Sequence, residues 1–310
     1  MAKQNWLGPI LLFGAALIWG ASFVAQDVGG VVGSFTFQAS RNTLGALTLL
    51  LVCIGKSLWQ KKKGTYRKPT EKETKMLLLG GVGCGLLLCV AVILQQFGID
   101  ANVTSPGKDA FITALYIVFV PVIALLLGRR SQLHVYLCVV VALVGLWLLC
   151  MSGSQITPGD ILMIGCSVAF ACHITLVDHV APHVDGIKLS CIQFTVAALV
   201  SAVGMFVTEH PDIRLILQNW MPIAYSGVLS AAGAYTLQIL GQQRTQPTAA
   251  CLIMSLESVF AVISSMILLP EVPAPTPREW LGMVVIFAAI IFSQIPLKYP
   301  TKKARTGEEK

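Results

Sequence analysis

The stretch TSPGKDAFITALYIVFV (104–120) has a counterpart in the second half of the chain, TQPTAACLIMSLESVFA (245–261). The two share Thr, Pro, Ile, Leu, Val and Phe at matching places. A second pair, LGPILLFGAALIWGASFVAQD (7–27) and PGDILMIGCSVAFACHITLVD (158–178), aligns glycines and a final aspartate in the same way. The chain is therefore predicted to be an internal duplication, and the fold depends on what one copy is.

The composition indicates that each copy lies in a membrane. The chain has 310 residues, of which 55% are hydrophobic and only 12% are charged, with a mean hydropathy of +0.75. Soluble domains average about 25% charged residues. Apolar runs of about 20 residues match a helix that crosses about 30 Å of hydrocarbon, and they do not alternate as barrel strands do. We predict an all-α polytopic membrane protein.

Ten such runs are expected to be transmembrane helices, five in each copy. Their approximate ranges are 8–27, 37–55, 76–97, 107–127, 133–151, 160–179, 187–207, 219–240, 247–269 and 279–296. Because five is odd, the second copy enters the membrane in the opposite orientation. Inverted repeats of this kind are characteristic of secondary transporters, whose substrate site lies near the midplane between the repeats.

Charged loops predict the orientation. With both termini in the cytoplasm, 18 of the 22 Lys and Arg residues fall inside, three fall outside and Arg41 lies within a span. This excess matches the positive-inside rule. Eight basic residues lie in a predicted cytoplasmic loop at 56–75, which argues against nucleic-acid binding because they flank the membrane. We expect repeats at 6–151 and 157–297 and a basic cytoplasmic tail at 298–310, in a bacterial inner membrane protein.

Four motifs in order resemble the EamA-type transporters of the drug/metabolite transporter superfamily. They are IWGASFVAQ (18–26), TSPGKDAFITALYIVFVPVIALLLG (104–128), FACHITLVD (170–178) and SLESVFAVISSMILLPE (255–271). The resemblance extends over nearly the whole chain. It implies ten helices around a central cavity and export of small metabolites such as amino acids.

Glu257 is the strongest candidate for a binding residue. It lies about ten residues into its span, or about 15 Å at 1.5 Å per residue, near the bilayer centre. An acidic residue there costs about 2.5–3.5 kcal/mol, and the side chain is too short to reach an interface. It is expected to bind a cationic group or carry a proton in a cavity, or else to be a protonated structural residue.

His173 and Ser22 occupy aligned mid-span positions of the two copies. His173 could carry a proton, neutralise Glu257 across the repeats, or simply pack through a hydrogen bond. Trp19 and Tyr116 are mid-span aromatic residues that could line the cavity, and Gln193 could hydrogen-bond a zwitterion. Packing within the helix bundle is the alternative for each.

Two further features concern partners. Lys108 begins the fourth span and could hold a carboxylate or phosphate, although it could equally reach to lipid headgroups. Gly81 and Gly85 form a GxxxG motif, which allows close helix packing or a homodimer.

The function predicted is transport of a small polar metabolite by alternating access, with proton or ion coupling as an option. No Walker motif is present, and no cofactor is expected, since none of the nine cysteines forms CxxC. A channel is the alternative, and an intramembrane enzyme is less favoured because HExxH and GxSxG are absent.

Overall fold

The computed structural model describes residues 6–101, 106–129, 132–150, 157–269, 274–293 and 295. Within these ranges the chain is helical, with no β-strand. The predicted tail at 298–310 lies outside them. The helices of the first repeat are α1 (Leu7–Gly29), α2 (Ser34–Lys62), α3 (Glu71–Ala101), α4 (Pro106–Thr113), α5 (Tyr116–Leu126) and α6 (Leu133–Cys150).

The second repeat follows the same order with more interruptions. Its helices are α7 (Pro158–Val180), α8 (Gly186–Thr208), α9 (Ile213–Gln218), α10 (Trp220–Ala224), the π-helix η3 (Tyr225–Ala234), α11 (Tyr235–Gln242), α12 (Pro247–Met254), α13 (Glu257–Leu268) and α14 (Pro277–Ser293). Single 3₁₀ turns, η1 (Gly30–Val32) and η2 (Ala181–His183), follow α1 and α7.

Helical structure covers each of the ten predicted spans in the described part of the chain. Eight helical segments, with broken helices joined, are long and apolar enough to cross a membrane, and Leu133–Leu148 is a shorter apolar helix. The all-helical membrane fold is confirmed. The number of ten crossings stays a prediction.

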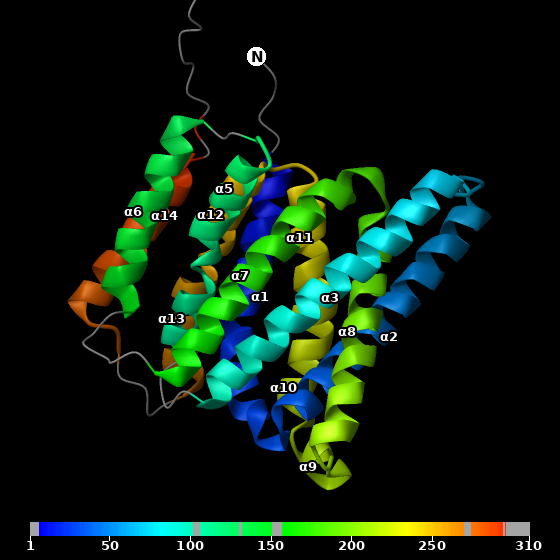
Figure 1. Cartoon of the computed structure of the whole chain (residues 1–310), viewed down its shortest axis with the longest axis horizontal. Coiled ribbons are helices and arrows are strands. Elements are labelled where there is room, and N and C mark those ends of the chain that lie inside the picture. Colours follow the sequence, from blue (N-terminus) through cyan, green and yellow to red (C-terminus); the bar gives the residue numbers. More distant parts are fainter. Residues whose placement is uncertain are drawn as a thin grey trace, which may run out of the picture.

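The packing has the pattern of two related halves. Helix α2 packs on its equivalent α8, α6 packs on α14, and α4 and α5 pack on α13 and α12. Helix α3 packs on α7, and α1 packs on α11 and η3. These two contacts are related, because α7 is the equivalent of α1 and the segment of η3 and α11 is the equivalent of α3. Figure 1 shows α6 and α14 side by side at one edge of the molecule and α2 and α3 extending toward the other. A two-fold relation between the repeats explains all of these pairs.

Capping boxes at threonine mark where three helices begin. Thr70, Thr157 and Thr276 each accept a hydrogen bond from the backbone N–H of an acidic residue three positions later, whose carboxylate accepts from the threonine N–H. This reciprocal pair satisfies two N–H groups that have no partner inside the helix. The sequence TPGD at 157–160 adds proline at the first helical position.

The loop predicted at 56–75 is shorter than expected. Helix α2 continues to Lys62 and α3 begins at Glu71, so only 63–70 lie between helices. Two lysines in the last turn of α2 favour the negative helix end. The Lys63 ammonium also lies 4.2 Å from the Trp59 ring centroid, so basic residues stabilise a helix that the hydropathy pattern ended at residue 55.

The GxxxG motif of α3 contacts α8 of the same chain. A Cβ on Gly81 would lie 2.6 Å from Ile192 Cγ2, and one on Gly85 would lie 2.7 Å from Val196 Cβ. The small face of the motif is thus occupied by close helix packing between the repeats. A homodimer stays a prediction.

Candidate functional site

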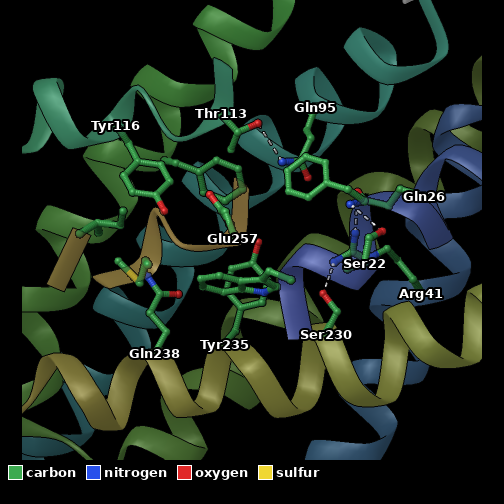
Figure 2. A pocket seen from close by; sticks show the side chains of 15 residues that line it. Ser22, Gln26, Arg41, Gln95, Thr113, Tyr116, Ser230, Tyr235, Gln238 and Glu257 are labelled. Carbon is green, nitrogen blue, oxygen red and sulfur yellow. Dashed lines mark hydrogen bonds between the residues drawn. The ribbon is translucent and has the colours of Figure 1, made fainter. Parts of the chain in front are cut away.

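A pocket lies between the repeats and is lined by side chains of both (Figure 2). Its apolar wall consists of Phe23, Phe170, Ile174 and Met254. The rest of its lining is polar or aromatic. A mostly enclosed space with a few convergent polar groups is the usual form of a small-molecule site.

Glu257 and Tyr116 enter the pocket from two broken helices. Helix α12 ends at Met254 and α13 begins with Glu257, while α4 ends at Thr113 and α5 begins with Tyr116. At each break the backbone tightens to hydrogen bonds three residues apart, from Leu256 N to Ile253 O and from Leu115 N to Ile112 O. Paired discontinuous helices are where transporters of inverted-repeat design hold their substrates.

Arg41 reaches the pocket from α2. It is 1% exposed, and its guanidinium donates to Gln26 Oε1 at 2.9 Å and to Ser230 Oγ at 3.4 Å. Gln26 is held in turn by its own Nε2, which donates to the Ser22 backbone oxygen. Figure 2 shows Arg41 beside these neutral groups.

Close packing of α2 on η3 places Arg41 there. A Cβ on Gly45 would lie 2.8 Å from Ala231 Cβ, and one on Gly227 would lie 2.9 Å from the Arg41 backbone oxygen. Glycine at both positions lets the two backbones approach. The π-helix carries Ser230 to Arg41, and π-helical segments are common at functional sites.

Tyr235 forms the centre of an aromatic wall. Its ring centroid lies 4.8 Å from that of Trp19 and 5.1 Å from that of Phe194, in edge-to-face arrangements. Both Trp19 and Tyr235 line the pocket, so α1 and α11 meet through these rings. Such contacts hold the rings in fixed orientations.

Several polar atoms at the pocket are buried without a hydrogen-bond partner. They are Trp19 Nε1, Ser22 Oγ, Arg41 Nε, Tyr116 Oη, Gln238 Oε1 and Glu257 Oε1. Because more than about 90% of buried polar groups in proteins are paired, six such atoms at one pocket indicate a site that a polar ligand or water completes.

His173 and Gln193 lie behind this wall instead of in it. His173 Nε2 donates to Gln193 Oε1 at 3.1 Å, and the His173 ring lies 6.3 Å from that of Tyr235. Neither residue belongs to the pocket lining, and no ion pair joins His173 to Glu257 within the described ranges. The structure thus places this pair next to the aromatic wall.

Lys108 is also outside the pocket lining, paired with the other repeat. Its Nζ lies 2.8 Å from Asp160 Oδ2, and the two side chains are 8% and 6% exposed. The ammonium therefore faces a carboxylate at the start of α7 rather than lipid headgroups. Of the seven predicted site residues, the pocket brings together Trp19, Ser22, Tyr116 and Glu257.

Sequence reasoning left out important parts of the pocket. Tyr235, like Tyr116, is an aromatic residue within a predicted span, but only Tyr116 was predicted to line the cavity. Gln26, Thr113 and Ser230 are ordinary polar residues near helix ends or breaks, and nothing in their sequence context distinguishes them. The position of Arg41, a few residues into its predicted span, favours reaching an interface or pairing structurally, with Asp27 or Asp178 as further options, whereas the structure places it in the pocket lining.

Comparison with known families decides the identity of the chain. The profile of the EamA-like transporter family matches residues 6–151 and 157–294, one match in each half. The chain belongs to the EamA-like transporter family. As an EamA-like transporter it is a multi-pass membrane protein. Each matched region contains one of the two helix breaks, and residues of both regions line the central pocket.

Relatives of this EamA-like chain are also transporters. An uncharacterized transporter of Archaeoglobus fulgidus is 27% identical over 284 residues, covering 89% of this chain and 82% of the relative. The threonine/homoserine exporter RhtA of Escherichia coli K12 is 27% identical over 303 residues, covering 94% and 92%. The crystal structure of another protein shares the fold, with a TM-score of 0.70 and 18% identity. The match covers 92% of this chain and 96% of that one.

Proposed function

We propose that this chain is a secondary transporter that exports a small polar metabolite, of the amino-acid class, by alternating access. The pocket between the repeats is its substrate site, and Glu257 binds a cationic group of the substrate there. The membrane is the bacterial cytoplasmic membrane, with both termini in the cytoplasm, as the distribution of basic residues favours.

One observation carries the proposal. The six unpartnered polar atoms described above surround a single pocket, and that pocket lies at the two aligned helix breaks. Among the described residues Glu257 Oε1 is buried without a hydrogen-bond partner, and the residue is only 4% exposed. The name of the RhtA relative supports the amino-acid class.

Counterflow in proteoliposomes tests this function. Vesicles containing the purified chain are loaded with unlabelled L-threonine or L-homoserine, and uptake of the labelled amino acid is followed. A carrier gives saturable uptake that internal substrate accelerates, whereas a channel gives neither. An imposed pH gradient then distinguishes proton coupling from movement down the substrate gradient alone.

The decisive variant is Glu257→Gln, which keeps the shape and removes the charge. Uptake is expected to fall at least about tenfold, because a buried charged hydrogen bond contributes about 1.5–3 kcal/mol. Glu71→Gln is the matched control, since Glu71 is exposed at the start of α3. Unchanged uptake and unchanged pH dependence in Glu257→Gln would refute the assignment.

A further inference from the structure

Arg41 is a buried cation that has no anionic partner in the part of the chain that the structure describes. Its hydrogen bonds go to a neutral amide oxygen and a neutral hydroxyl, and its Nε has no partner. The ion pairs among the described residues join Lys56 to Asp185, Arg67 to Glu73, Lys108 to Asp160 and Arg129 to Asp178. A buried charge without a counter-charge is costly, so Arg41 lacks what a purely structural arginine would have.

Glu257 is the corresponding anion. Within the described ranges it belongs to none of those ion pairs, its Oε1 is buried without a hydrogen-bond partner, and the Tyr116 side chain lies beside it (Figure 2). Of the described residues that line the pocket, Arg41 and Glu257 are the only Lys, Arg, Asp or Glu. One uncompensated positive charge and one uncompensated negative charge therefore face the same space.

The two charges do not compensate each other. Among the described residues no ion pair joins Arg41 to Glu257, and Tyr235 lines the same pocket. Figure 2 shows Arg41 near Ser22 and Ser230 at one end of the pocket, with Glu257 beside Tyr116 toward the other. A ligand that satisfies both groups must carry an anion and a cation at its two ends.

We propose that the pocket selects zwitterions, with the Arg41 guanidinium binding a substrate carboxylate and the Glu257 carboxylate binding the substrate ammonium. This rests on the transport function proposed above and assigns its specificity. A planar guanidinium matches a carboxylate through parallel N–H donors, and an ammonium suits a single carboxylate. An amine alone would leave Arg41 without a counter-charge, and an acid alone would leave Glu257 without one.

Three probes that differ in charge separate the two subsites. L-Threonine is a zwitterion, L-threoninamide lacks the carboxylate, and N-acetyl-L-threonine lacks the ammonium. Each is tested as an inhibitor of labelled L-threonine counterflow by the full-length chain in liposomes. Unlabelled L-threonine is expected to inhibit at concentrations at least about tenfold lower than either analogue, since each charged hydrogen bond lost is worth about tenfold or more.

Substitutions then assign each subsite. Arg41→Gln should weaken L-threonine inhibition and reduce the preference over L-threoninamide to about twofold or less, while the preference over N-acetyl-L-threonine persists. Glu257→Gln should reduce the preference over N-acetyl-L-threonine to about twofold or less, while the preference over L-threoninamide persists. Arg41→Lys should retain a preference for L-threonine, because the charge remains. Arg244→Gln should leave both ratios as in the wild type, since Arg244 is outside the pocket lining and hydrogen-bonds the Leu240 backbone oxygen.

The outcomes distinguish this proposal from the transport function. Equal inhibition of the wild type by L-threonine and L-threoninamide, or a wild-type preference in Arg41→Gln, would overturn the zwitterion assignment while Glu257-dependent transport still stands. Absence of saturable counterflow would remove both. The wild-type ratios decide the question even if no Arg41 variant folds.

Discussion

Tyr116 and Glu257 hold the same position in the two repeats, each being the first residue after a helix break, and both line the pocket. Symmetry of the backbone thus presents two chemically different groups to one site. The carboxylate supplies charge, and the phenol supplies a hydroxyl without a hydrogen-bond partner beside it. A duplicated fold can in this way build a site that is not symmetric.

Tyr116→Phe should lower transport without lowering stability. Within the described ranges the hydroxyl makes no hydrogen bond of 3.5 Å or less, so its removal costs the folded state little. We expect a severalfold loss of L-threonine counterflow and a thermal unfolding temperature equal to or above that of the wild type. Tyr225→Phe is the matched control, because the Tyr225 hydroxyl donates to the Ile18 backbone oxygen at 2.9 Å. It should lose about 1 kcal/mol of stability. A destabilised Tyr116→Phe with normal transport would contradict this expectation.

Gly45→Ala should disturb the position of Arg41. The new Cβ would lie 2.8 Å from Ala231 Cβ and 3.1 Å from the Gly227 backbone oxygen, so α2 and η3 must separate. Overpacking of this kind costs about 1–3 kcal/mol. Gly55→Ala in the same helix has nothing within 4 Å of its Cβ and should be neutral or gain up to about 1 kcal/mol. Thermal unfolding of the two variants in one detergent makes the comparison, and equal effects would argue against close packing as the reason for Gly45.

Lys108→Met should strongly destabilise the protein. It leaves Asp160 as a buried carboxylate without its cation, a loss of about 3–5 kcal/mol. Adding Asp160→Asn should recover part of this loss, because the remaining charge is then removed. The double-mutant cycle measures the coupling between the two side chains. Additive losses would show that the two residues do not interact.

Asp185, just before α8, forms an ion pair with Lys56 of α2 and so connects the two repeats. This pair makes a pH-dependent contribution to the free energy of unfolding. Burial raises the pKa of this carboxyl, but the hydrogen bond from Lys56 and those from the Lys188 and Ile187 N–H groups outweigh burial, so the pKa lies below its ordinary value of 3.8. The stabilisation is therefore complete above about pH 3.8 and is lost as the pH falls through the lower, folded-state value.

Asp185→Asn keeps the cap of α8 and removes the charge. Because both partners are about one-third exposed, we expect a loss of less than about 1 kcal/mol at pH 7, shrinking as the pH falls below 3.8. Unfolding is measured from pH 3 to 7 in the wild type and in Lys56→Met. In the Lys56→Met background, Asp185→Asn should change the free energy of unfolding less than it does in the wild type. A change that is the same in both backgrounds and at every pH would exclude the ion pair as its cause.

The repeats and most helices could be predicted from the sequence because hydropathy and the duplication are local patterns. The helix breaks could not, since uncharged residues without Gly or Pro continue through 114–115 and 255–256 and only the backbone reveals the tightened turns. Similarly, the extension of α2 to Lys62 lay beyond the apolar run that predicted the span.

The site was partly predictable for the same reason. Glu257 and Tyr116 stand mid-span, which is visible in one dimension, and their role in binding stays a prediction. The pairing of Lys108 with Asp160 and the inward direction of Arg41 depend on helices from the other repeat. Those contacts follow from the tertiary arrangement, which periodicity along one helix does not encode.

Placing one guanidinium and one carboxylate in the same pocket has an electrical consequence. When Glu257 is ionised and carries no proton across, the two charges cancel and a zwitterion adds none, so the occupied and the empty carrier have the same net charge. A voltage of 100 mV does about 2.3 kcal/mol of work on each elementary charge moved across the membrane, but none on such a neutral unit. Exchange of substrate by this protein would run at the same rate in polarised and depolarised cells.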